Sequence, residues 1–336
     1  MRQYKIFAMN KTILILLAAS TCCLAACKKI TDGFLSDTLR YKSPDLYCQR
    51  GLPLVQSDPI NLDGSTPPIS FKMLNLRDSS GKALAAEWNT KYNIVAFKPG
   101  MTFNVDTDTT VDLLNKKRET LNVTPMDFNT VSGQLSFNKG SLNLPLGIYV
   151  FDIQATNVHG TKFYPSLGRI NVVDPTTDDM FGLEDNANNA FSDATGGVTP
   201  MKGLKVIFTK VSADGARIFL KLSDKNGNPF NPSAGEIIKR GDRPTFENYT
   251  KFHPISYNDT SMICDFEVPP FPLAKYVDAA GSNWNHLMYY RIPSKYVLID
   301  GLGAHQYSAN VRIAFNVKLE GTYIVEYRMP DATRTP

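Results

Sequence analysis

Alternation of apolar and polar residues with a period of two recurs along this chain and restricts what it can fold into. Every second position is apolar in one long run, residues 311–319, and in three shorter runs, residues 69–73, 149–155 and 217–222. Successive side chains of an extended strand point to opposite faces, so each run would bury one face and expose the other. The pattern therefore predicts an all-β protein of mostly antiparallel sandwiches.

Two further local patterns lead to specific expectations. Short helices are expected at residues 111–118, after two threonines able to cap them, and at residues 183–191. The turn pair Asp214-Gly215 predicts a hairpin that joins residues 204–211 to residues 217–222.

The N-terminus carries a targeting signal. Cationic residues precede the apolar run at residues 13–19, and Leu24-Ala25-Ala26 leads to Cys27. This arrangement is typical of a secretory signal peptide, predicted here at residues 1–26. Residues 24–27 also resemble the bacterial lipobox, which implies that Cys27 is lipidated, with palmitate among its acyl chains, and becomes the new N-terminus. The alternative is an ordinary cleaved signal with an incidental cysteine.

The predicted lipid anchor determines the expected cellular location. Acyl chains on Cys27 would hold the protein on a membrane, and no later stretch approaches eighteen apolar residues. Lys28 and Lys29 occupy the position where an aspartate would resemble an inner-membrane retention signal, so the outer membrane is favoured. The sequence leaves two possibilities for the side of the outer membrane on which the protein lies, the periplasm and the cell surface, and the cell surface is favoured.

The layout resembles that of Bacteroidetes-type outer-membrane lipoproteins. Residues 145–157 with Gly160 look like the last hairpin of bacterial immunoglobulin-like or cadherin-like modules, and the later half is similar to the sandwich domains of uncharacterised two-domain lipoproteins associated with Sus-type polysaccharide-uptake systems. The predicted division is a signal peptide at 1–26, lipidated Cys27 with a tether to residue 50, an immunoglobulin-like sandwich at 51–174, and a larger, jelly-roll-like sandwich at 175–332 as the candidate ligand-binding domain.

The net charge excludes one class of partner, and the cysteine count limits the possible disulfides. The formal charge is +4 over 336 residues and falls to about +1 when the signal leaves, with no basic stripe, so nucleic acid is not an expected partner. Outside the signal and Cys27 the sequence holds Cys48 and Cys264. They can form a disulfide in an exported protein, or they can remain separate thiols.

No motif in the sequence indicates catalysis. The four histidines lie in four different segments, and none of the nucleophile, metalloprotease or phosphate-loop signatures is present. Carboxylates that could pair in a glycosidase are available at Glu236, Asp242, Glu247, Asp259, Asp265 and Glu267. The protein is therefore expected not to be an enzyme, and a glycan-active enzyme ranks third among its functions.

Sugar recognition needs a flat apolar surface beside hydrogen-bonding groups. The segment Asn283-Trp284-Asn285-His286 supplies both, and Tyr249 and Phe252 form a second-rank cluster. The alternative is that Trp284 packs in the core. Tyr289 and Tyr290 follow on a predicted strand, where at most one of them can face a ligand.

Acidic residues crowd the proposed domain junction. Asp174, Asp178, Asp179 and Asp185 are oxygen ligands of the kind that calcium prefers, although their spacing does not match an EF-hand. The expectation is that the protein holds no metal or cofactor, and calcium at these residues is the alternative, because solvated linkers are often acidic.

These patterns together predict a lipid-anchored outer-membrane protein that binds a glycan or assists polysaccharide capture beside an outer-membrane transporter. The alternative is a structural or assembly lipoprotein that contacts protein partners through exposed sheet edges and has no small ligand.

Overall fold

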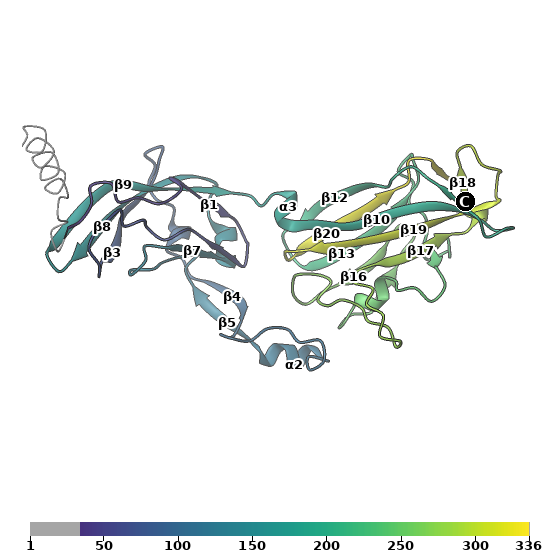
Figure 1. Ribbon diagram of the computed structural model, residues 1–336, viewed down its shortest axis with the longest axis horizontal. Helices are drawn as coiled ribbons and strands as arrows, with labels where there is room; N and C mark the ends of the chain where they lie inside the picture. Colours follow the sequence, from purple (N-terminus) through teal and green to yellow (C-terminus); the bar gives the residue numbers. More distant parts are fainter. Residues whose placement is uncertain (1–33, 336) are drawn as a thin grey trace, which may run out of the picture.

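The computed structural model describes residues 34–335, which form two bodies, each built from β-sheets around its own core (Figure 1). Most of the regular structure is strand, which confirms the predicted all-β fold. Buried residues of the first core extend to Val172 and those of the second begin at Met180, so the predicted division after residue 174 falls between them. The signal peptide at 1–26 and Cys27 lie outside the described residues.

The first domain consists of two facing sheets and an extra ribbon. Its strands are β1 (Asp45–Gln49), β2 (Leu54–Gln56), β3 (Ser70–Asp78), β4 (Tyr92–Phe97), β5 (Arg118–Val123), β6 (Met126–Phe128), β7 (Leu135–Asn138), β8 (Gly147–Asn157) and β9 (Gly160–Val173). Its helical segments are η1 (Ala86–Trp88), α2 (Val111–Lys116) and η2 (Lys139–Asn143). Sheets with strand orders β1-β9-β8-β3 and β2-β7-β6 enclose the core. Strands β8 and β9 form the hairpin predicted at residues 145–160, with Asn157 opposite Gly160.

The tether predicted at residues 27–50 is wrong over the part that the structure describes. Leu39 and Tyr41 are buried in the first core, and β1 pairs in parallel with β9, placing Cys48 in the same core. The five residues of β1 are too few to show a sustained period, and their partner strand lies more than a hundred residues later. Sequence patterning alone therefore could not show that this segment belongs to a sheet.

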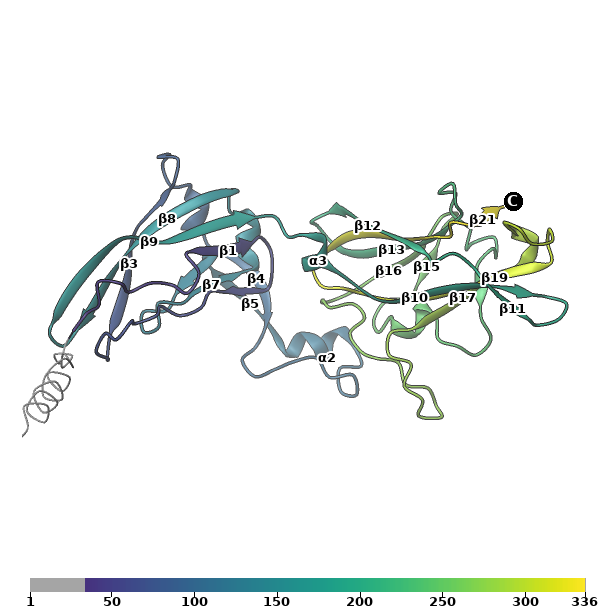
Figure 2. The same cartoon turned by 45° about the horizontal axis from the view of Figure 1, so that its top comes forward.

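An arm extends from the first domain towards the second. Strands β4 and β5 pair with each other in a separate ribbon, with α2 between them in the chain, and we call residues 92–123 the arm. Both views show it reaching beneath the second domain (Figures 1 and 2). The hydroxyl of Thr110 accepts a hydrogen bond from the Leu113 N–H and caps α2, so the helix predicted at 111–118 is present and ends at Lys116.

The second domain is a larger sandwich. Its strands are β10 (Phe181–Ser192), β11 (Val198–Pro200), β12 (Lys205–Ser212), β13 (Ala216–Ser223), β14 (Ile238–Lys239), β15 (Ser256–Tyr257), β16 (Met262–Asp265), β17 (Met288–Ile292), β18 (Val297–Ile299), β19 (Tyr307–Val317), β20 (Gly321–Arg328) and β21 (Ala332–Arg334). Its helical segments are α3 (Thr177–Met180), η3 (Phe246–Tyr249) and η4 (Ser294–Tyr296). One sheet has the order β11-β10-β19-β17-β14 and the other β12-β20-β13-β16-β15, with the core between them.

Two local predictions for this domain are wrong. The segment 183–191 is not a helix but part of β10, which pairs antiparallel with β19. Residues 204–211 and 217–222 do not form a hairpin, because β20 lies between β12 and β13 and pairs with both. In each case a strand that comes more than a hundred residues later supplies the pairing, which local propensity cannot reveal.

Candidate functional site

Trp284 lies in the loop before β17 and is held in place by its own loop. The loop folds back on itself, since the Trp284 N–H donates to the Tyr276 carbonyl and the Tyr276 N–H to the Asn285 carbonyl. The indole Nε1–H donates to Asp278 Oδ2 at 2.8 Å, and this bond contributes most to keeping the pKa of Asp278 below its usual value. The half-buried indole is thus fixed in orientation, with its edge against Tyr289 (ring centroids 5.8 Å apart).

Tyr289 belongs to the outward side of the sheet β11-β10-β19-β17-β14. Met288, Tyr290 and Ile292 of β17 are in the core, so the alternate residues Tyr289 and Arg291 point the other way. This outcome agrees with the expectation that only one of the two neighbouring tyrosines can face a ligand.

Strand register gathers the outward residues of three strands. Tyr289 lies opposite Arg312 and Arg291 opposite Asn310 on β19, and Asn310 lies opposite Asn189 on β10. With their neighbours these residues make up what we call the arginine–aromatic face: Trp284, Tyr289, Phe191, Arg240, Arg243, Arg291, Arg312, Asn189 and Asn310.

Guanidinium groups cover the aromatic rings of this face. The Cζ atoms of Arg240 and Arg243 lie 5.9 and 5.5 Å from the centroid of the Tyr289 ring. The Cζ of Arg291 lies 3.9 Å from the centroid of the Phe191 ring. These cation–π contacts orient the guanidinium planes and explain why Tyr289 is only 8% exposed although it points away from the core.

A chain of polar contacts holds the centre of the face. Arg291 Nε donates to Asn310 Oδ1 at 2.8 Å, and Asn310 Nδ2 donates to Asn189 Oδ1 at 3.0 Å. Beside them, Arg312 Nη2 donates to Asp185 Oδ1 at 3.1 Å. These hydrogen bonds orient Arg291, Asn310 and Arg312, so the centre of the face is organised in the protein by itself.

The face carries a concentration of positive charge. Burial, and after it the charges of Arg243 and Arg291, lower the pKa of the Arg240 guanidinium from its ordinary value. Within residues 34–335, Arg312 pairs with Asp185, whereas Arg240, Arg243 and Arg291 form no ion pair. The arginine–aromatic face can therefore bind anionic groups and other hydrogen-bond acceptors through several N–H donors at once.

The four residues of the predicted sugar platform, 283–286, do not all lie at the same place on the surface. Asn283 and Asn285 are exposed on the loop that carries Trp284, next to the face. His286 has different neighbours: its Nδ1 lies 2.8 Å from Glu184 Oε2, and its ring meets the Tyr249 ring edge-on. Trp284 with its two asparagines therefore borders the arginine–aromatic face, whereas the contacts of His286 are with Glu184 and Tyr249.

The two second-rank residues do not join this platform. Tyr249 is 5% exposed in the second core and donates its hydroxyl hydrogen to the Leu287 carbonyl at 2.7 Å. Phe252 packs edge-on against Phe103 of the arm, with ring centroids 6.4 Å apart. The structure therefore separates both residues from the Trp284 platform, since Tyr249 packs in the core and Phe252 contacts the arm.

The candidate calcium residues are dispersed. Asp174 pairs with Arg50, Asp185 pairs with Arg312, and Asp179 completes a capping box with Thr176 at the start of α3. The remaining residue, Asp178, accepts from the Lys318 ammonium through its carbonyl. Among the described residues no group of three or more potential ligands converges, so the structure does not gather the candidate calcium residues into one site.

Of the two alternatives for the cysteines, the structure has the separate thiols and not the disulfide. Cys48 of β1 lies in the first core and Cys264 of β16 in the second, and both are free thiols. Burial raises the pKa of each to about 12, so both stay protonated.

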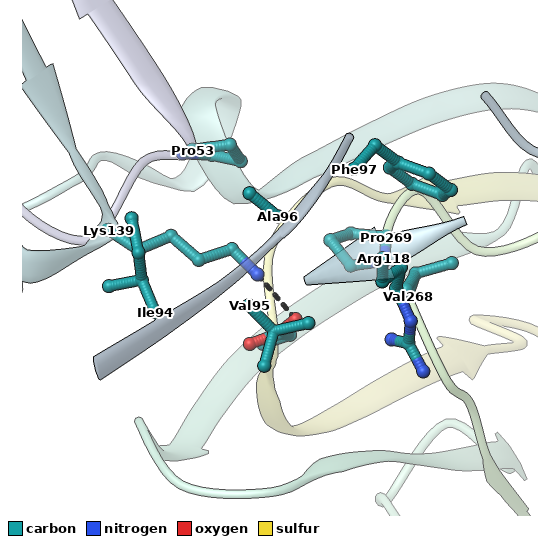
Figure 3. A pocket seen from close by; sticks show the side chains of 10 residues that line it. Pro53, Ile94, Val95, Ala96, Phe97, Arg118, Lys139, Val268 and Pro269 are labelled. Atoms are coloured by element: carbon teal, nitrogen blue, oxygen red, sulfur yellow. Dashed lines mark hydrogen bonds and ion pairs between the residues drawn. The ribbon is translucent and has the colours of Figure 1, made fainter. Parts of the chain in front are cut away.

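A cavity of about 170 Å³ lies where the arm meets the second domain (Figure 3). Val95, Phe97 and Arg118 of the arm line it together with Val268 and Pro269 of the second domain. A more open hollow of about 660 Å³ adjoins it and shares Val95, Arg118 and Lys139. Because residues of both domains line the two hollows, we assign them to the junction between the domains.

The arginines were missed because no single segment contains the cluster. The available signal was polar residues at every second position of otherwise apolar strands, Tyr289-x-Arg291 and Asn310-x-Arg312. Only the register of β17 and β19 brings the two pairs together.

No helix in the described part of the chain is long and apolar enough to cross a membrane. Comparison with known protein families and with curated proteins finds no match. The proposals below therefore depend on the geometry of the site and on the N-terminal signal.

Proposed function

We propose that this protein is a lipid-anchored outer-membrane protein that binds a glycan on the arginine–aromatic face of its second domain, beside an uptake transporter. The observation that carries the proposal is the fixed, half-buried indole of Trp284 at the border of a face rich in hydrogen-bond donors. An indole offers a flat apolar surface to the C–H groups of a sugar ring, and arginine and asparagine side chains bond its hydroxyls.

The first domain is proposed as a spacer between the membrane and the binding domain. The described chain begins at Phe34, seven residues after Cys27, and its carbonyl accepts from Asn157 Nδ2 beside the turn between β8 and β9. This turn lies at the end of the first domain that is far from the second domain (Figure 1). A lipid on Cys27 would thus leave the arginine–aromatic face away from the anchor.

Affinity electrophoresis of residues 28–336 against plant, host and microbial polysaccharides tests the proposal. We expect retardation by at least one polymer, and Trp284→Ala should weaken it about tenfold or more, because it removes the aromatic surface proposed to contact the sugar ring. Phe163→Ala is the matched control, because Phe163 is an exposed aromatic residue of the first domain (50% exposed) and should have no effect.

Other results of this experiment would support a different function. Absence of retardation by any polymer would favour the assembly lipoprotein, which contacts protein partners and has no small ligand. Release of reducing sugar, followed in parallel, would show a glycan-active enzyme. Thermal unfolding of Trp284→Ala must resemble that of the unmodified chain for the binding comparison to hold.

A further inference from the structure

The arginine–aromatic face holds more positive charge than its own carboxylates balance. Arg240, Arg243 and Arg291 have no ion pair within residues 34–335, and Arg312 has Asp185 alone. The Nε atoms of Arg240 and of Arg312 are buried and have no hydrogen-bond partner in this part of the chain. Buried donors without partners are unfavourable, and so is the clustering of like charges.

Stacking explains the position of these groups but not their number. Arg291 lies over Phe191, and Arg240 and Arg243 lie over Tyr289, so their positive charges are placed against aromatic rings. A neutral sugar could be bound by amides and one or two donors alone. Several guanidinium groups on one face are the arrangement that recognises planar or tetrahedral oxyanions through paired N–H donors.

We infer that the glycan bound at this face is acidic and carries oxyanions, either the carboxylates of uronic acids or sulfate esters. This inference rests on the proposed function and names its substrate class. The oxyanions would lie over Arg243 and Arg291, while Trp284 at the border would contact the ring of a neighbouring sugar.

Matched polymer pairs separate charge from sugar. Residues 28–336 are tested by affinity electrophoresis against polygalacturonate and its fully methyl-esterified form, and against dextran sulfate and dextran. We expect binding about tenfold or more tighter to the charged member of one pair, and the pair that responds identifies carboxylate or sulfate as the group recognised.

Charge-neutralising variants locate the effect. Arg243→Gln and Arg291→Gln should each abolish most of the preference for the charged polymer. Arg243 is exposed and makes no hydrogen bond within the described chain, so its variant should fold normally even if Arg291→Gln, which loses a bond to Asn310, does not. Arg217→Gln is the control, because it removes the same charge from an exposed site on β13 of the opposite sheet.

The outcomes distinguish this inference from the function it rests on. Equal binding of charged and neutral members, still dependent on Trp284, would overturn the inference and leave the proposed function intact. An equal loss in the Arg217→Gln control, or equal retardation by a DNA duplex, would show non-specific attraction of polyanions and overturn it too. If no polymer is bound at all, both the inference and the proposed function are overturned.

Discussion

Glu236 illustrates, at the residue scale, how this protein stabilises a carboxylate inside its second domain. Only 4% exposed, it accepts from Arg334 Nε at 2.6 Å, from Arg334 Nη2 at 2.7 Å and from the Asn231 N–H at 2.9 Å. Burial by itself would raise the pKa of Glu236, but these donors outweigh it and lower the pKa below its ordinary value. The pair ties the C-terminal strand β21 to the rest of the sandwich.

Glu236→Gln should therefore destabilise the second domain by about 3 kcal/mol, because it leaves Arg334 without its charged partner. A carboxyl whose pKa is lower in the folded state adds stability above its unfolded pKa of about 4.3 and loses it as the pH falls through the folded value. Urea unfolding should show a full difference between variant and unmodified chain at pH 7 and a narrowing difference below about pH 4. A constant difference down to pH 2 would contradict the assignment.

The two cysteines give a second prediction at this scale. Both thiols are buried, and the pKa of each is raised to about 12, so the reactive thiolate is absent at neutral pH. We expect neither Cys48 nor Cys264 in residues 28–336 to react with a thiol reagent in the folded protein, and both to react in denaturant without prior reduction. Two thiols that appear only after reduction would indicate the disulfide that this structure excludes.

At the element scale, the close approach of β9 to the first core depends on Gly168. Gly168 lies opposite Phe151 of β8, and a Cβ added there would stand 2.1 Å from the Phe151 ring, which is fully buried. Gly168→Ala should destabilise the first domain by about 2–3 kcal/mol, because the ring has no free space to enter. Gly203→Ala is the control, since a Cβ there meets nothing within 4 Å. Equal thermal unfolding of the two variants would refute the argument.

How far the elements could be predicted depends on where their pairing partners lie. The β8–β9 hairpin was predictable because its turn and its alternation are local. Segment 183–191 was mistaken for a helix because Asp185-Asn186-Ala187-Asn188-Asn189 has no clear period. Its strand structure comes from pairing with β19, more than a hundred residues away. Strand β20 also comes more than a hundred residues after β12 and β13. It lies between them and pairs with both, so the predicted hairpin does not form.

For the candidate site, sequence reasoning found Trp284 and its asparagines because they are adjacent in one loop. It could not find the arginine–aromatic face, whose members run from Asn189 to Arg312 and meet only through the register of β10, β19 and β17. Tyr249 and Phe252 resembled ligand-binding residues in composition, but the tertiary structure uses them in the core and at the domain junction. Residue type therefore indicated the chemistry, and only the fold indicated the location.

At the scale of the whole molecule, the arm joins the two domains into one unit. Arg118 Nη2 lies 3.4 Å from Glu267 Oε2, Lys251 Nζ donates to the Val105 carbonyl at 2.8 Å, and Phe103 meets Phe252. Nearer the linker, Lys139 Nζ and Glu320 Oε1 lie 2.6 Å apart (Figure 3). Interfaces between domains of one chain are often mobile, so these contacts determine how firmly the second domain is held relative to the first.

Removing two of these contacts should loosen the pair of domains without unfolding either. An ion pair with partly exposed groups and one edge-on aromatic contact together contribute about 2 kcal/mol, which corresponds to a roughly thirtyfold change in the ratio of docked to undocked molecules. The double variant Phe103→Ala, Arg118→Ala should therefore show a larger radius of gyration by small-angle X-ray scattering, while thermal unfolding of the two sandwiches stays nearly unchanged. Arg169→Ala removes an ion pair with Asp45 inside the first domain and should leave the scattering as it was. If the double variant scatters like the unmodified chain, these two contacts are not what holds the domains together. The contacts Lys251–Val105 and Lys139–Glu320 would then have to do so.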